Sequence, residues 1–296
     1  MAALARRSLQ RLVRLQVESK GSRFIVSRHM SQGEKPLSGK SAIVTGSTSG
    51  IGLGIARALA SNGCNIVFTG HKDEAGIREL HQEFTRQHKV KANYIPAELT
   101  RPSDIEKLCH ETMAYYPEGV NILINAAGIQ HVCPIEKFPL ERWDTMMSVM
   151  LTAPFQVIKH LLPAMKAKGW GRIVNVSTVH GLVASVNKCA YVAAKHGLNG
   201  LTKVVALETA GTGVTCNSIC PGWVLSTMME QQIAQASAEN GISWDEAKLL
   251  LISQKQPSMQ FATIEQVAAS VVYLCSPAAD QMTGSCMTMD GGWTAQ

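Results

Sequence analysis

Tyr191 and Lys195 lie four residues apart in a segment with helical periodicity, so we expect both side chains on one face of a helix. A phenol ordinarily loses its proton near pKa ~10, and a nearby ammonium favours the ionised form. This pair could therefore exchange a proton with a bound molecule near neutral pH. The spacing alone is weak evidence, because tyrosine and lysine four residues apart are common on exposed helix faces.

A glycine-rich turn follows the first apolar run of the main body of the chain, with the sequence Thr45-Gly-Ser-Thr-Ser-Gly-Ile-Gly52. Glycines allow a tight turn and a close approach of the backbone to a pyrophosphate, whose charge a helix N-terminus then stabilises. The alternative is a turn with a purely structural role. The position of this turn, between the first strand and the first helix, favours a dinucleotide site.

Short apolar runs rich in β-branched residues alternate with helical patterns along the chain. They predict strands over 41–45, 65–69, 92–95, 121–125, 172–177, 214–219 and 285–289. Between them we predict helices over 50–61, 74–88, 102–115 and 141–167, and one that bears Tyr191 and ends near residue 207. This alternation predicts an α/β fold, a Rossmann-type doubly wound parallel sheet of about seven strands in a single domain.

Four motifs together resemble the classical short-chain dehydrogenase/reductase family: Thr45-Gly-x-x-x-Gly-x-Gly52, Asn125-Ala-Ala-Gly128, Tyr191-x-x-x-Lys195 and Pro221-Gly222. The resemblance covers about residues 38–296, which we expect to form the enzyme domain. Longer segments, among them Gly128–Val132, His180–Ser185, Pro221–Val224 and Asp290–Gln296, are similar to the D-3-hydroxybutyrate dehydrogenase subgroup.

The resemblance implies reversible hydride transfer between a nicotinamide and a secondary alcohol, here the oxidation of (R)-3-hydroxybutyrate to acetoacetate. Tyr191 would be the acid/base, and Lys195 would lower its pKa and hold the nicotinamide ribose. Thr178 would supply the hydroxyl that binds the substrate oxygen, at a position where the family usually has serine. A carboxylate clamp and its walls would comprise Gln130, His180, Lys188, Gln232, Trp223 and Trp293. The cofactor would contact Gly46, Ser49, Gly50, Ile51, Gly52, Glu98, Asn125, Tyr191, Lys195 and Val224.

Three positions depart from the family pattern. Met150 replaces an asparagine that, in the family, holds a water and supports a break in the helix, neither of which a thioether does well. We expect Met150 to slow proton exchange without abolishing hydride transfer. Glu98 replaces an aspartate beside the adenine, and Ala126 replaces a second asparagine with a mild expected effect.

The identity of the cofactor depends on the end of the second strand, where an acid favours NAD and a base favours NADP. The sequence there is Gly70-His71-Lys72, with no acid until Asp73. The subgroup resemblance favours NAD, and the two basic residues leave NADP open. The family commonly forms tetramers, so a homotetramer is expected by analogy.

Two other functions compete with this interpretation. A reductase of another 3-oxo acid or thioester would use the same fold, but a thioester offers no free carboxylate to a clamp. A dinucleotide-binding protein with impaired catalysis is consistent with Met150 and Thr178, although the intact pair Tyr191 and Lys195 argues against it.

Charge is concentrated in residues 1–30, which carry seven Lys or Arg residues against Glu18 and so account for the net charge of +6. This segment resembles a mitochondrial transit peptide, which predicts the mitochondrial matrix, or the cytoplasm if translation starts at Met30. The neutral remainder argues against nucleic-acid binding, and no apolar run reaches the ~18 residues of a membrane span. The eight cysteines lack metal-site spacing, so we expect reduced thiols and no metal site.

Overall fold

The computed structural model describes residues 35–295, so the segment 1–30 on which the transit peptide was predicted lies outside the described residues. A seven-stranded parallel sheet with the order β3-β2-β1-β4-β5-β6-β7 forms the centre of the structure. Its strands are β1 (Ser41–Thr45), β2 (Asn65–Phe68), β3 (Ala92–Tyr94), β4 (Ile122–Asn125), β5 (Gly171–Val176), β6 (Val214–Pro221) and β7 (Cys286–Met289). The prediction of a Rossmann-type parallel sheet is therefore confirmed.

The strand order reverses beside β1, which pairs with β2 on one side and with β4 on the other. Thr45, the last residue of β1, is in register with Asn125, the last residue of β4. In open parallel sheets ligands bind beyond the carboxyl ends of the strands at such a reversal. The glycine-rich turn after β1 therefore lies at the position where this topology places a ligand.

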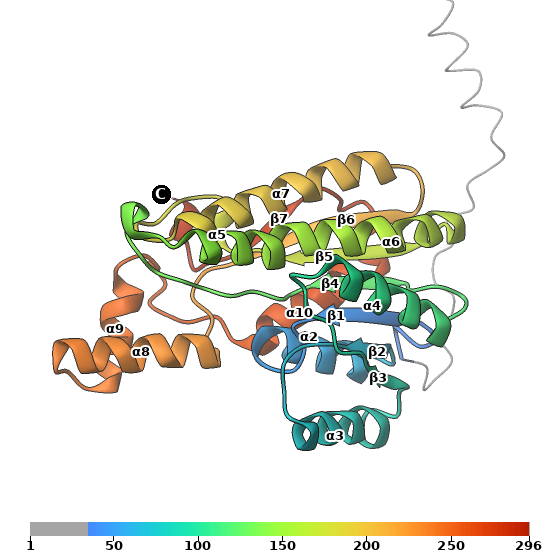
Figure 1. Ribbon diagram of the computed structural model, residues 1–296, viewed down its shortest axis with the longest axis horizontal. Coiled ribbons are helices and arrows are strands. Elements are labelled where there is room, and N and C mark those ends of the chain that lie inside the picture. The colour runs from blue at the N-terminus through green and yellow to red at the C-terminus, as the bar shows by residue number, and fades with distance from the viewer. Residues whose placement is uncertain (1–34, 296) are drawn as a thin grey trace, which may run out of the picture. The chain divides into compact units, whose positions relative to one another are not determined.

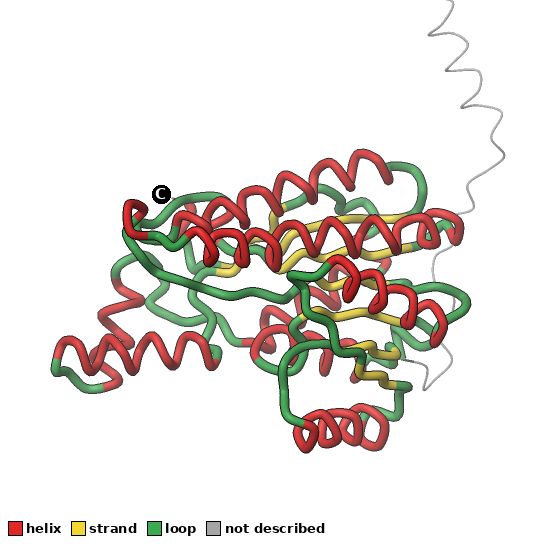
Figure 2. Tube along the Cα trace, in the orientation of Figure 1, coloured by secondary structure: helices red, strands yellow, loops and turns green. Residues whose placement is uncertain are grey.

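Helices cover both faces of the sheet (Figures 1 and 2). The main ones are α2 (Gly50–Ser61), α3 (Glu74–Gln82), α4 (Pro102–Tyr115), α6 (Ala153–Lys168), α7 (Cys189–Thr209) and α10 (Ile264–Leu274). Residues of α2, α3 and α10 share one buried apolar cluster, and residues of α4, α6 and α7 share another. The sheet separates the two clusters, because Ala42 and Val44 of β1 belong to the first while Ile43 belongs to the second.

The predicted helix over 141–167 is interrupted. It consists of α5 (Leu140–Met147), a π-helical turn over Ser148–Thr152, and α6. Met150 lies in that turn, is fully buried, and packs in a cluster with Ala190 and Ala194 of α7. The break in the helix therefore forms without an asparagine side chain to support it.

Three helices after β6 were not assigned by the sequence analysis: α8 (Thr227–Asn240), α9 (Trp244–Ser253) and α10. Of these, α8 and α9 extend away from the sheet (Figure 1). Met229 and Ile233 of α8 pack with Ala247 of α9 in a separate apolar cluster. Trp223 and Phe261, which flank the helix pair in sequence, pack against that cluster. The pair therefore has a core of its own, distinct from the two clusters of the sheet.

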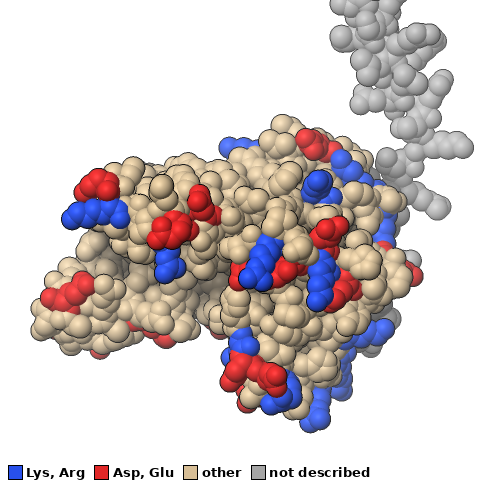
Figure 3. Space-filling model, viewed as in Figure 1, with Lys and Arg blue, Asp and Glu red and all other residues tan. Residues whose placement is uncertain are grey.

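Basic and acidic side chains are interspersed on the face shown in Figure 3, where no large area carries a single sign of charge. Within residues 35–295, none of the helices is both long and apolar enough to cross a membrane.

Candidate active site

Two cavities meet beyond the carboxyl ends of the central strands. The larger measures about 550 Å³ and the smaller about 110 Å³. The side chain of Tyr191 lines both cavities, and four other residues are shared between them: Ile51, Ser177, Ser226 and Met228. The predicted acid/base residue therefore lies at the junction of two spaces of very different size.

The glycine-rich turn forms one end of the larger cavity, and its geometry requires glycine. A Cβ on Gly52 would lie 2.2 Å from the carbonyl oxygen of Gly46, and Gly46 itself has a left-handed φ of 65°. Helix α2 begins at Gly50, and Ser49 before it makes no side-chain capping hydrogen bond. The backbone approach and the free helix N-terminus fit the phosphates of a dinucleotide.

Eight of the ten residues predicted to contact the cofactor line the larger cavity: Gly46, Ser49, Gly50, Ile51, Gly52, Glu98, Tyr191 and Lys195. The other two do not. Asn125 is buried, and its Nδ2 donates to Oδ1 of Asn175 at 2.8 Å. Its own Oδ1 has no hydrogen-bond partner among residues 35–295. Val224 lines the smaller cavity instead.

Helix α7 presents Tyr191 and Lys195 to the cavities, and the lysine Nζ lies 5.8 Å from the centre of the tyrosine ring. The same Nζ donates to the carbonyl oxygen of Val176 at 2.7 Å, which anchors the lysine to the end of β5. Thr178 lies two residues beyond, and its hydroxyl donates to the carbonyl oxygen of Pro221 at 3.1 Å. The three predicted catalytic residues are thus brought together by two neighbouring strands and one helix.

Burial is the main cause of the pKa shifts of Tyr191 and Lys195. It raises the pKa of Tyr191 to about 12, although a hydrogen bond with Thr178 acts in the opposite direction and lowers this pKa. It lowers the pKa of Lys195 to about 8. Both shifts favour the uncharged side chain, as expected for groups removed from water. The lowering of the tyrosine pKa by Lys195 remains a prediction.

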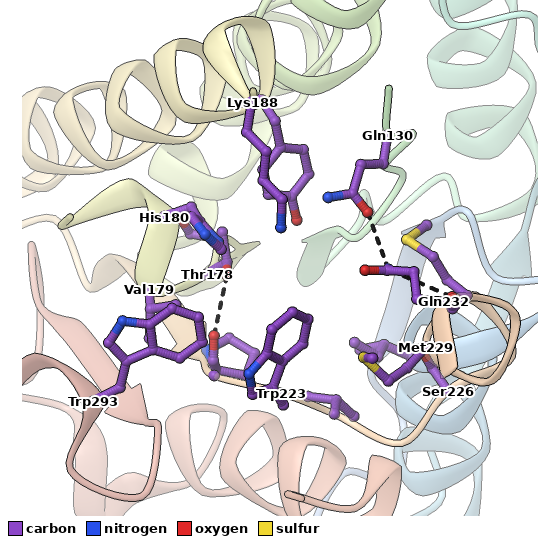
Figure 4. Close-up of a pocket in the computed structure, with 17 residues that line it drawn as sticks. Gln130, Thr178, Val179, His180, Lys188, Trp223, Ser226, Met229, Gln232 and Trp293 are labelled. Atoms are coloured by element: carbon purple, nitrogen blue, oxygen red, sulfur yellow. Dashed lines mark hydrogen bonds between the residues drawn. The ribbon is translucent and has the colours of Figure 1, made fainter. Parts of the chain in front are cut away.

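All six residues predicted to bind the substrate line the smaller cavity: Gln130, His180, Lys188, Trp223, Gln232 and Trp293. Figure 4 shows Lys188 and Gln130 on one side of this cavity and Trp223 on the opposite side. Nε2 of Gln232, on α8, donates to Oε1 of Gln130 at 3.2 Å, which joins this helix to a loop 102 residues away in sequence. The half-buried Lys188 supplies a cation to this cavity, and burial lowers the pKa of its ammonium group.

Aromatic rings close the far end of the smaller cavity. The ring of Trp293 lies 5.4 Å from that of His180 and 5.6 Å from that of Trp223, measured between ring centres. Nε2 of His180 is 2.8 Å from the hydroxyl of Ser185. Burial, followed by the nearby cations Lys188 and Lys255, lowers the pKa of His180 to about 4, so its ring is neutral at pH 7.

Sequence reasoning missed several residues that line these cavities. Ser226 and Met228, at the start of α8, line both of them, and Met229 lines the smaller. Arg142 and Thr145 of α5 line the larger. No motif marks these side chains, because their helices reach the site only through long-range packing.

The chain is similar to two bacterial proteins with the name D-beta-hydroxybutyrate dehydrogenase. The protein from Cupriavidus necator is 49% identical over 88% of this chain and 100% of its own length. The protein from Rhizobium meliloti is 47% identical over 87% of this chain and 99% of its own length.

These relatives contradict the predicted mitochondrial matrix location. Both come from bacteria, which have no mitochondria, and nothing in the comparisons indicates targeting. The prediction from the Arg-rich segment is therefore wrong.

Solved structures have the same fold. L-sorbose reductase from Gluconobacter frateurii, complexed with NADPH and L-sorbose, matches with a TM-score of 0.84 at 25% identity, over 89% of this chain and 99% of that one. An actinorhodin polyketide ketoreductase with NADPH matches with a TM-score of 0.80 at 33% identity, over 87% of this chain and 98% of that one. A family model described as short chain dehydrogenase matches residues 40–238. The chain therefore belongs to the short-chain dehydrogenase family of oxidoreductases.

Proposed function

We propose that this protein catalyses the reversible, NAD-dependent oxidation of (R)-3-hydroxybutyrate to acetoacetate, with residues 38–296 as its enzyme domain. One observation carries the proposal. A cavity of about 110 Å³ combines proton-exchanging groups, Tyr191 and Thr178, with carboxylate-binding groups, Lys188 and the paired Gln130 and Gln232. A cavity of this size suits a short hydroxy acid. The names of the two bacterial relatives support the same substrate.

A short anionic substrate buries little apolar area, so charge-assisted hydrogen bonds must orient it. Lys188 would pair with the carboxylate, and Gln130 and Gln232 would donate amide hydrogens to it. The neutral His180 would offer a ring N–H without adding a second charge. Trp223 and Trp293 would limit the length of the carbon chain and exclude water from it.

The opposite end of the substrate would reach Tyr191. Thr178 would hydrogen-bond the substrate hydroxyl and hold it beside the phenol, which takes the hydroxyl proton during oxidation and returns it during reduction. Lys195, anchored by Val176, would favour the ionised phenol when the lysine is charged. A nicotinamide dinucleotide, when bound, supplies the hydride acceptor of the oxidation.

NAD is the proposed cofactor because of the residues at the end of β2. Asp73 caps α3 by accepting from the backbone N–H of Gly76 at 3.0 Å, so it faces the helix. The stem of Lys72 also packs on Gly76, since a Cβ there would lie 2.1 Å from the lysine Cε. His71 lines the larger cavity, with Nε2 3.9 Å from a carboxylate oxygen of Glu98. That carboxylate would repel the 2′-phosphate of NADP.

The formation of NADH from (R)-3-hydroxybutyrate, followed by its absorbance, tests the proposal. The (S) enantiomer and NADP are the controls. Stereospecific turnover with NAD is the expected result. Normal NAD binding without turnover of any hydroxy acid would instead identify a dinucleotide-binding protein with impaired catalysis. Light scattering of the full chain tests the homotetramer, which we infer from the family alone.

A further inference from the structure

Gln256 is a buried polar residue that lines neither of the two cavities. It lies between α9 and α10, and only 2% of its surface is exposed. Its Oε1 accepts a hydrogen bond from the backbone N–H of Trp223 at 3.0 Å. Its Nε2 donates to the carbonyl oxygen of Gln260. Both ends of the amide are therefore satisfied inside the protein, as a buried polar group requires.

The amide fits there because two glycines leave it space. A Cβ on Gly222 would lie 2.6 Å from Oε1 of Gln256, and a Cβ on Gly291 would lie 2.8 Å from its Cγ. Real Cβ atoms do not approach so closely. Gly222 immediately precedes Trp223, and Gly291 lies two residues before Trp293. The glutamine is thus wedged between the two turns that carry the tryptophans of the smaller cavity.

Backbone hydrogen bonds connect the same three segments. The carbonyl oxygen of Trp223 accepts from the N–H of Ala262 at 2.9 Å, so both of its backbone polar groups bind the 256–262 segment. The N–H of Ser258 donates to the carbonyl oxygen of Gly291 at 3.0 Å. Each tryptophan turn is therefore attached to the segment that begins at Gln256.

Gln256 affects the smaller cavity through the positions of the two tryptophan rings. Trp223 and Trp293 lie 5.6 Å apart between ring centres, and Trp293 contacts His180 at 5.4 Å. All three line the smaller cavity, whereas Gln256 does not. A displaced Trp223 would change the length of the cavity without touching Tyr191.

We propose that Gln256 is a positioning residue that sets the substrate length accepted by the smaller cavity, acting through Trp223 and Trp293. This inference rests on the proposed function for its kinetic test. Gln256→Met keeps a similar volume and removes both hydrogen bonds. Gln254→Met is the matched control, because Gln254 is exposed at the end of α9, two residues away.

The kinetic test compares (R)-3-hydroxybutyrate with its five-carbon homologue, (R)-3-hydroxypentanoate. In Gln256→Met we expect the KM for the four-carbon acid to rise about tenfold, the size of effect that one lost hydrogen bond produces. We expect kcat to fall less than about threefold, and the kcat/KM ratio of the homologue to the four-carbon acid to rise at least about fivefold. The affinity for NAD, measured by equilibrium titration, and all constants of Gln254→Met should match the wild type.

The proposal would be overturned if kcat fell only as much as the amount of folded protein, with KM and the chain-length ratio unchanged. A purely structural role of Gln256 predicts that result. Gln256→Leu provides a second variant if the methionine variant does not fold. It also removes both hydrogen bonds and adds no charge, so its KM and its chain-length ratio should shift in the same direction as in Gln256→Met. A wild-type KM and chain-length ratio in this variant would also contradict the proposal.

A measurement without substrate separates this inference from the proposed function. Iodide quenching of tryptophan fluorescence should increase in Gln256→Met, and the increase should disappear when Trp223→Phe is combined with it. Unchanged quenching would refute the positioning role even if the enzyme were active. Absence of turnover in the wild type would refute the proposed substrate alone, and the quenching result would still decide the role of Gln256.

Discussion

The ammonium of Lys188 lies over the indole ring of Trp223, with Nζ 5.4 Å from the ring centre. A cation at this distance from an aromatic face is attracted by the ring, typically by about 0.5–2 kcal/mol. The contact holds the lysine at the wall of the smaller cavity and points its charge inward, where a substrate carboxylate would bind. The tryptophan therefore helps to place the cation as well as to enclose the substrate.

Replacing Lys188 with methionine should weaken the binding of free acids selectively. A charge-assisted hydrogen bond contributes about 1.5–3 kcal/mol, so the KM for (R)-3-hydroxybutyrate should rise about 10- to 150-fold. Steady-state kinetics with the acid and with a neutral ketone of similar size would measure the effect. Lys159→Met, at an exposed position on α6, is the control. Equal effects of Lys188→Met on the acid and the ketone would show that no carboxylate clamp exists.

Tyr191→Phe should remove the proton acceptor and leave the ring packing intact. Acid/base catalysis by a side chain contributes typically ~10² to ~10⁴ in rate, and kcat should fall by that order. The affinity for NAD should change little, which equilibrium titration of the variant would establish. A variant that keeps more than about a tenth of the wild-type kcat would identify another group as the acid/base.

His180 should make the folded protein less stable in acid. Burial lowers its folded pKa from 6.5 to about 4, so between these values the unfolded chain binds a proton that the folded protein does not. The free energy of unfolding therefore falls as pH decreases through this window, by about 2 kcal/mol at pH 5. Urea denaturation at pH 7 and pH 5 should show a smaller loss in His180→Gln than in the wild type. An equal loss in both proteins would assign the acid sensitivity elsewhere.

Met150→Asn should increase turnover at a cost in stability. The thioether is fully buried against Ala190 and Ala194, so an amide there is removed from water and should destabilise the fold by about 1–3 kcal/mol. If Met150 slows proton exchange with solvent, the asparagine should raise kcat when both proteins are measured well below their melting temperatures. An unchanged kcat would mean that the relay does not pass through this position.

His71→Asp should strengthen the preference for NAD. A carboxylate at the end of β2 accepts from the ribose hydroxyl of NAD and repels the 2′-phosphate of NADP. The ratio of the Kd for NADP to the Kd for NAD, measured by equilibrium titration, should rise at least about tenfold. Lys72→Met should leave the ratio within about twofold, because the stem of Lys72 packs on Gly76. A larger effect of Lys72 than of His71 would reverse the assignment.

The α/β class, all seven strands and the position of the glycine-rich turn could be predicted from the sequence. These features depend on local patterns, since a buried parallel strand such as Ser41–Thr45 is a continuous apolar run and a tight turn needs glycine. The pairing of Tyr191 with Lys195 is equally local, because both lie one turn apart on α7. Helices α8, α9 and α10 were not predicted. The apolar residues of α8 and α9 pack in a small core of their own, and those of α10 pack against one face of the sheet.

The tertiary structure decided which of these residues meet. Gln130 and Gln232 lie 102 residues apart, and only the tertiary packing of α8 brings their amides to 3.2 Å. Gln256 carries no motif, and its place between Gly222 and Gly291 exists only once three distant turns pack together. The strands and most of the helices could be predicted because they depend on residues that are neighbours in the chain. The dimensions of the site depend on contacts between segments that the sequence keeps far apart.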